Sequence, residues 1–73
     1  MFENKLIEVK EMFGDYSEKY KSADTLELII LTLRENGFAY GSIQRWLGNP
    51  SKKIIRNVLL KYNPNLINIC EKK

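Results

Sequence analysis

The sequence predicts an all-α fold: a tri-helical core with an additional N-terminal helix and a short C-terminal tail. Apolar residues recur at spacings of three and four over most of the 73 residues, as they do on one side of an α-helix. Residues that favour the start and the end of helices separate these segments. The run 26–33 is short and apolar enough to form a strand, but helix signals bound it at both ends.

Residues 2–21 are expected to form an N-terminal helical segment, in which 2–13 is the first helix. Gly14 would end or bend that helix. A looser apolar pattern continues beyond it, so a single helix that reaches about Lys21 stays open. We expect the segment to pack in a core or a coiled coil rather than to bind a ligand, and it is a candidate dimerisation element. Its apolar stripe consists of Phe2, Leu6, Val9 and Phe13.

A second helix is expected over 25–34. Asp24 and Glu27 form an Asp-x-x-Glu variant of the capping box at its start, and Asn36-Gly37 is a good left-handed stop. Apolar residues lie on two sides of this helix, so both sides must be buried. One side should pack on the following helices, and the other needs the N-terminal helix or a second subunit. The first side holds Leu26, Ile29, Ile30 and Leu33, and the second holds Leu28 and Leu31.

Two further helices are expected over about 39–47 and 50–62. Gly48 would close the first of these. Asn49 would cap the second, with Pro50 at its first helical position, where the missing N–H has no cost. The inward residues are Ile43, Trp46 and Leu47 on 39–47, and Ile55, Val58, Leu59 and Tyr62 on 50–62.

The chain after the last long helix is expected to be a short tail, residues 63–73. Asn63 precedes Pro64, and a residue before proline resists helical geometry. The tail could add a short helix or a strand through its apolar residues. These are Leu66, Ile67, Ile69 and Cys70.

The chain is at most one small domain, and its composition lacks the usual staples of such domains. A core of this size rarely supplies more than about 3–5 kcal/mol. Cys70 is the single cysteine and there is no histidine, which excludes an internal disulfide and argues against a zinc site. We therefore expect a homodimer. The first residues do not resemble a secretory signal and no apolar run approaches the ~20 residues of a membrane span, so a cytoplasmic location is expected.

Charge divides between the two halves of the chain, whose net charge is +3. Residues 1–36 hold five basic and eight acidic residues, a net charge of −3. Residues 37–73 hold seven basic residues and one acid, Glu71, a net charge of +6, and no acid lies between Asn36 and Cys70. A surface of one sign suits a polyanion such as a nucleic-acid backbone.

The chain contains Gly37-Phe38, Ile43 and Leu47-Gly48, followed by a helix that opens Pro-Ser-Lys-Lys-Ile-Ile-Arg. This pattern resembles the helix-turn-helix of bacterial and phage DNA-binding proteins, which include repressors and the DNA-binding parts of transposases and resolvases. The likeness covers about residues 25–62, which is nearly all of the tri-helical unit of residues 24–62. It implies that 39–47 crosses the DNA backbone and that 50–62 lies in the major groove of double-stranded DNA.

Three positions near the turn bear on this resemblance. Ala39 stands where the family often has Ser or Thr, so the start of that helix lacks a side-chain cap. Gln44 stands where the family prefers a small residue, often Ala. Either Ile54 or Ile55 can serve as the buried anchor after the turn.

Helical geometry turns one side of 50–62 toward the expected DNA, with Lys53 and Asn57 almost directly outward. Arg56 can bind guanine through O6 and N7, and Asn57 can pair with adenine N6 and N7. Lys53 could reach a base or a phosphate. Phosphate contacts that fix the register are expected from Lys52, Lys61, Arg45 and Ser42. The candidate DNA-binding residues are Ser42, Arg45, Ser51, Lys52, Lys53, Arg56, Asn57 and Lys61.

Three other residues of the basic half have more than one interpretation. Trp46 is expected in the core rather than in a stack with a base. Tyr40 could lie at the edge of the core or donate a hydrogen bond to a phosphate. Leu60 is apolar on the outer side, where it could touch a thymine methyl, pack on the tail or join a dimer interface.

Catalysis finds little support, because the chain has no histidine, no Cys–His pair and no paired carboxylates in its basic half. We expect no enzyme activity, cofactor, metal, membrane contact or small-molecule ligand. We expect sequence-specific binding of double-stranded DNA by a small transcriptional regulator or accessory protein of a phage, plasmid or other mobile element. The alternative is a small inhibitor or adaptor that binds an acidic partner protein through Leu60, Trp46 and Lys53. A third possibility is a fragment of a recombinase.

Overall fold

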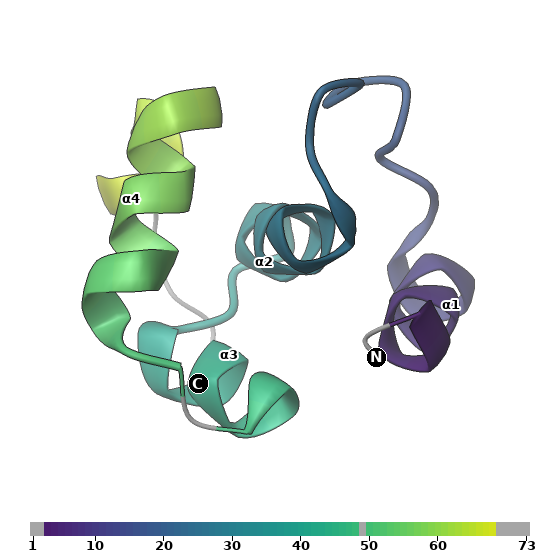
Figure 1. Cartoon of the computed structure of the whole chain (residues 1–73), viewed down its shortest axis with the longest axis horizontal. Helices are drawn as coiled ribbons and strands as arrows, with labels where there is room; N and C mark the ends of the chain where they lie inside the picture. The colour runs from purple at the N-terminus through teal and green to yellow at the C-terminus, as the bar shows by residue number, and fades with distance from the viewer. Residues whose placement is uncertain (1–2, 49, 69–73) are drawn as a thin grey trace.

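Four α-helices and one 3-10 helix follow one another in the computed structural model, which describes residues 3–48 and 50–68 (Figure 1). α2 lies at the centre, with α1 on one side of it and α3 and α4 on the other (Figure 1). No strand occurs within the described residues. The predicted all-α fold, a three-helix core with an additional N-terminal helix and a short C-terminal tail, is confirmed. The elements are α1 (Glu3–Phe13), α2 (Thr25–Glu35), α3 (Tyr40–Leu47), α4 (Lys52–Tyr62) and the 3-10 helix η1 (Pro64–Asn68).

α2 begins at the capping box that the sequence predicts. The Asp24 carboxylate accepts a hydrogen bond from the N–H of Glu27 at 2.8 Å, and the Glu27 carboxylate accepts one from the N–H of Asp24 at 3.1 Å. The helix ends at Glu35, one residue later than predicted, and Gly37 follows with a left-handed φ of 86°. The alternative of a strand over 26–33 is therefore wrong.

α2 is buried on both of its apolar sides, as predicted. α1 packs against it opposite α3 and α4, so the N-terminal helix covers the side for which a second subunit was the other candidate. α1 contributes the fully buried Val9 together with Leu6 and Phe13, which are partly buried. The ring of Phe13 meets that of Phe38 edge to face, with 5.3 Å between the centroids. The buried residues of α2 are Leu28, Ile29, Ile30, Leu31, Thr32, Leu33 and Arg34.

α1 ends where a glycine allows the chain to turn. Gly14 has a φ of 101°, and its N–H donates to the main-chain oxygen of Lys10 at 2.8 Å. Residues 17–22 form turns, so the alternative of a single helix to about Lys21 is wrong. Phe2, the first member of the predicted apolar stripe, lies outside the described residues.

The segment between α1 and α2 is held across the bundle by a buried tyrosine. The hydroxyl of Tyr20 donates to the Glu35 carboxylate at 2.6 Å and accepts from the side-chain amide of Asn63 at 3.1 Å. Lys19 forms an ion pair with the same carboxylate. The rings of Tyr20 and Tyr62 meet edge to face, with 6.2 Å between the centroids. These contacts join the segment to the C-terminal ends of α2 and α4.

α4 begins two residues later than predicted, so Pro50 precedes the helix rather than opening it. The N-cap is Ser51, whose hydroxyl accepts a hydrogen bond from the N–H of Ile54 at 3.2 Å, and not Asn49, which lies outside the described residues. Pro50 stays outside the helix, where its main-chain oxygen accepts a hydrogen bond from the side-chain amide of Gln44 at 2.9 Å.

α3 and α4 present the inward stripes that the sequence predicts. Gly48, with a left-handed φ of 77°, closes α3 as expected, and Ala39 starts it without a side-chain cap. Ile55 is buried while Ile54 is exposed, which settles which isoleucine anchors the turn. On α3 the inward residues are the buried Ile43 and Leu47 and the partly buried Trp46. On α4 they are Ile55, the buried Val58 and Leu59 and the partly buried Tyr62.

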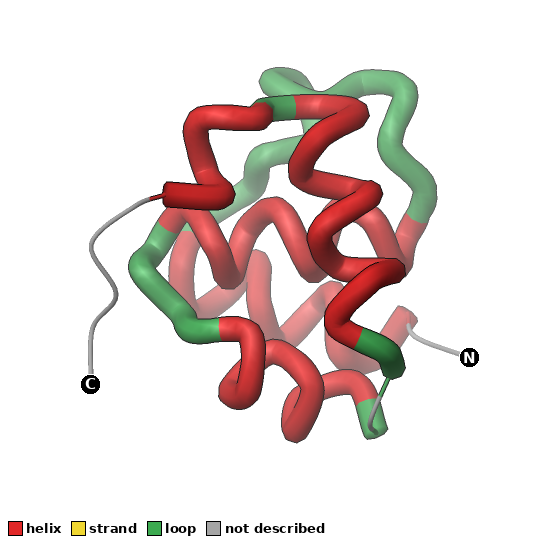
Figure 2. The backbone as a smooth tube through the Cα atoms, turned by 90° about the vertical axis from the view of Figure 1, so that its left-hand side faces the viewer, coloured by secondary structure: helices red, strands yellow, loops and turns green. Residues whose placement is uncertain are grey.

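The residues after α4 form η1, which folds back beside that helix (Figure 2). Leu66 is buried there. The main-chain oxygens of Leu66 and Ile67 accept hydrogen bonds from the buried Arg34 of α2. The tail thus forms a short helix over 64–68, one of the two alternatives. Ile69 and Cys70 lie outside the described residues.

Candidate nucleic-acid interface

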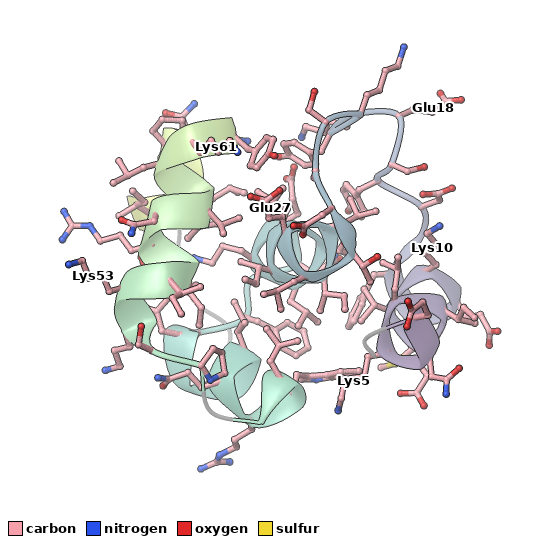
Figure 3. The ribbon with its side chains drawn as sticks, viewed as in Figure 1. Lys5, Lys10, Glu18, Glu27, Lys53 and Lys61 are labelled. Carbon is pink, nitrogen blue, oxygen red and sulfur yellow. The ribbon has the colours of Figure 1, made fainter. Side chains whose placement is uncertain are left out.

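The outer side of α4 carries polar and basic side chains that solvent reaches freely. Lys52, Lys53, Arg56 and Asn57 are all exposed, while the opposite side of the helix is buried. In Figure 3 the side chain of Lys53 points away from α2 and out into solvent. The outward orientation predicted for Lys53 and Asn57 is therefore confirmed.

The first turn of α4 places two cations beside a helix N-terminus. The helix dipole favours acidic residues there, but this turn holds none and carries Lys52 and Lys53 instead. The hydroxyl oxygen of Ser51 accepts the N–H of Ile54 as the helix cap, and its O–H can still donate a hydrogen bond. In the free protein each lysine lowers the stability of the helix by a few tenths of a kcal/mol, because its charge has the same sign as this end of the dipole. A phosphate bound at this end would offset that cost.

α3 adds one exposed cation and one half-buried hydroxyl. Arg45 is exposed in the last turn of α3, and Ser42 lies partly buried in its first turn. α3 packs against α4, and the hydrogen bond from Gln44 to the oxygen of Pro50 ties the connection between them to α3. The side chains of the two helices are therefore held in a fixed relation.

Tyr40 lies at the edge of the core, one of the two positions that the sequence allowed. Its ring centroid is 4.6 Å from the guanidinium carbon of Arg34. Its hydroxyl is buried and has no hydrogen-bond partner within the described residues. The hydroxyl is therefore turned away from the solvent side, where a phosphate would lie.

Lys61 differs from the other candidate cations because it faces α2. Its Nζ lies 3.7 Å from Glu27 Oε2 and 5.1 Å from the centroid of the Tyr62 ring, and its side chain is 65% exposed. Figure 3 shows Lys61 and Glu27 between α4 and α2, with Lys53 on the far side of α4. The Tyr62 hydroxyl and then the charge of Glu27 raise the pKa of Lys61. Lys61 is therefore a lysine at the margin of the outer side, already engaged with a carboxylate.

Glu27 is held in place by three groups. Partial burial acts to raise its pKa, but the Tyr62 hydroxyl at 2.7 Å, the N–H of Asp24 and the charge of Lys61 together lower that pKa below its usual value. The carboxylate is therefore fixed by the capping box and by α4 at once, which explains why it can hold Lys61 on this side.

No family model, curated protein or solved structure matches this chain. Within residues 3–48 and 50–68, no group of three His, Cys, Asp or Glu side chains is placed to hold a metal ion, and no pocket is found. None of the helices in this part of the chain is long and apolar enough to cross a membrane.

The sequence does not reveal two contacts that shape this candidate surface. The first is the hydrogen bond from Gln44 to Pro50, whose signal is an amide at a position where a small residue is expected. The second is the ion pair of Lys61 with Glu27, which joins distant parts of the chain and has no local signal. The first fixes the connection between α3 and α4, and the second marks one edge of the basic surface.

Proposed function

We propose that this protein binds double-stranded DNA, with α4 in the major groove and α3 across the sugar–phosphate backbone. The exposed basic side of α4 carries this proposal. It belongs to a stretch, residues 36–68, that has five cations and no carboxylate side chain. A surface of one sign on two packed helices joined by a short turn is suited to a phosphate backbone and a groove.

The exposed side chains divide by the chemistry they offer. Arg56 presents a planar fork that matches guanine O6 and N7, and Asn57 presents an amide that matches adenine N6 and N7. Lys53, at the start of the same helix, can reach a base or a phosphate. The remaining candidates would contact phosphates and fix the register, and they are Ser42, Arg45, Ser51, Lys52 and Lys61.

The biological role that fits this surface is a small transcriptional regulator or an accessory DNA-binding protein of a phage, plasmid or other mobile element. A homodimer is part of the proposal, because small cores gain stability by association. The proposed location is the cytoplasm. Since α1 buries its stripe against α2, a dimer would use the outer side of α1 or another surface.

Fluorescence anisotropy with a labelled duplex selected from a random pool tests the proposal. About five phosphate contacts per subunit predict a log–log slope of affinity against salt near −4 to −5 per subunit. Lys53→Ala should weaken binding, and it should reduce the slope by about 1 if Lys53 binds a phosphate. Lys21→Ala, an exposed lysine of the acidic half, is the matched control and should change neither affinity nor slope. No binding to any duplex at low salt would exclude this function.

A partner protein with an acidic surface is the second candidate. Its support is that α4 exposes Leu60 and Ile54 among its cations, and protein interfaces combine apolar side chains at the centre with a polar rim. The same salt series separates the two functions. Tight binding to a protein, together with no affinity for duplex DNA at low salt, would favour this candidate.

A further inference from the structure

Leu60 lies on the outer side of α4 in line with the candidate DNA contacts. It follows Lys53 and Asn57 at spacings of seven and three residues, which places all three along one outward line of the helix. Leu60 is 48% exposed. Every other leucine in the described residues is buried or partly buried, so Leu60 is the exception in this chain.

The packing of the chain gives Leu60 no role in the core. η1 packs against α4, yet among the described residues Leu60 stays exposed. The buried stripe of α4 is already complete in Ile55, Val58 and Leu59. An apolar side chain at this place can therefore serve an external surface.

The major groove offers one apolar group to such a side chain. Leucine can neither donate nor accept a hydrogen bond, so it gains nothing from a phosphate or from the polar edge of a base. The C5 methyl of thymine is the apolar group that projects into the major groove. Three residues of helix rise about 4.5 Å and neighbouring base pairs are about 3.4 Å apart, so Leu60 falls about one base-pair step beyond the base that faces Asn57.

Resting on the DNA-binding function proposed above, we propose that Leu60 determines specificity by contacting a thymine methyl. The thymine lies about one base pair from the adenine that Asn57 binds. The chain thus reads a short segment in which hydrogen bonds recognise one base and an apolar contact recognises the next. The apolar contact contributes to the binding affinity, and unlike the charged contacts of α4 it is not screened by salt.

Replacing thymine by deoxyuridine, one position at a time, in the selected duplex tests this inference, because the change removes the methyl and keeps every hydrogen-bonding group. Affinity should fall about fourfold at one thymine, the factor that corresponds to one methyl removed from water. Leu60→Ala should bind the thymine and uracil duplexes equally. Asn57→Ala and Ile54→Ala should keep the difference, since neither removes the leucine; Ile54 is the other exposed apolar residue of α4.

The controls separate failure of this inference from failure of DNA binding. Circular dichroism should show native helix content for Leu60→Ala, because the side chain is exposed. Duplex binding that no uracil substitution weakens, or a Leu60→Ala variant that still prefers thymine, would overturn the role of Leu60 and leave DNA binding standing. A Leu60→Ala variant that changes its oligomeric state in sedimentation would also overturn it, in favour of a contact between copies. Absence of duplex binding would overturn both proposals.

Discussion

Arg34 Nε donates a hydrogen bond of 2.6 Å to the main-chain oxygen of Leu66, which joins the end of α2 to the segment that follows α4. The same guanidinium donates to the oxygens of Phe38 at 2.8 Å and Ile67 at 2.9 Å and stacks on the ring of Tyr40. Arg34 is 1% exposed. One buried cation therefore fixes the α2–α3 turn, the start of α3 and η1 relative to one another.

Arg34→Met should destabilise the protein by about 3–5 kcal/mol. Methionine fills part of the volume but donates no hydrogen bond, so several buried main-chain oxygens would lose their donor. Urea unfolding followed by far-UV circular dichroism measures the loss as a lower midpoint, or as the lack of a folded baseline. Arg34→Lys should reduce the stability less than Arg34→Met does, because the lysine ammonium can still donate hydrogen bonds to some of these oxygens.

The matched control is Arg45→Met on the exposed side of α3. A surface substitution away from buried polar groups changes stability by about 0.5 kcal/mol or less. If the two Met variants unfolded at the same urea concentration, the hydrogen bonds of Arg34 would contribute little to stability.

Gly48→Ala should destabilise the protein by about 1 kcal/mol, purely through backbone conformation. Gly48 has a φ of 77°, and a Cβ added there would meet nothing within 4 Å, so no clash contributes. Gly41 has the same open surroundings but lies inside α3. Gly41→Ala should therefore stabilise the protein by about 0.5–1 kcal/mol. Thermal unfolding should show a lower midpoint for Gly48→Ala and a higher midpoint for Gly41→Ala. Midpoints that shift in the same direction would contradict the left-handed conformation of Gly48.

Glu27 should make stability fall as the pH drops below its ordinary pKa of 4.5. Burial acts to raise its pKa, but the hydrogen bonds from Tyr62 and Asp24 and the charge of Lys61 outweigh it, so the pKa is lowered in the folded state. A lowered pKa means that the contribution is complete above the unfolded value and disappears as the pH falls through the folded one. The difference in unfolding free energy between the native protein and Glu27→Gln should be largest above about pH 5 and shrink toward pH 3.

Glu8→Gln controls for the change in net charge, because Glu8 is exposed on α1. Urea unfolding at pH 7, 5 and 3 provides the comparison. A gap between native and Glu27→Gln protein that is the same at all three pH values would show that the ionised carboxylate makes no special contribution.

Features of the fold that depend on neighbours in sequence could be predicted. The capping box of Asp24 and Glu27 and the left-handed Gly48 act within one turn of the chain, so local patterns reveal them. The inward and outward sides of α4 follow from helical periodicity alone. The candidate side chains Lys53 and Asn57 therefore lie where the sequence puts them.

Features that depend on tertiary packing could not be predicted. Asn49 and Ser51 are both good N-cap residues, and the local pattern does not show that Ser51 is the cap or that the oxygen of Pro50 accepts a hydrogen bond from Gln44. The burial of Arg34 depends on oxygens more than 30 residues away. In the sequence alone, nothing distinguishes Arg34 from the other basic residues of the N-terminal half.

Arg56→Ala and Lys61→Ala should affect DNA binding in different ways. Loss of Arg56 should weaken binding to the selected duplex by about 1–3 kcal/mol and relax the preference at one base pair, because a guanine contact carries sequence information. Loss of Lys61 should weaken binding to all sequences alike, and by less than loss of Lys53, because Lys61 already lies 3.7 Å from a carboxylate oxygen of Glu27. Competition between the selected duplex and its single-base variants at fixed salt measures both effects. An Arg56→Ala loss that is equal on every sequence would make Arg56 a phosphate contact, and a Lys61→Ala loss as large as that of Lys53→Ala would show that DNA displaces Glu27.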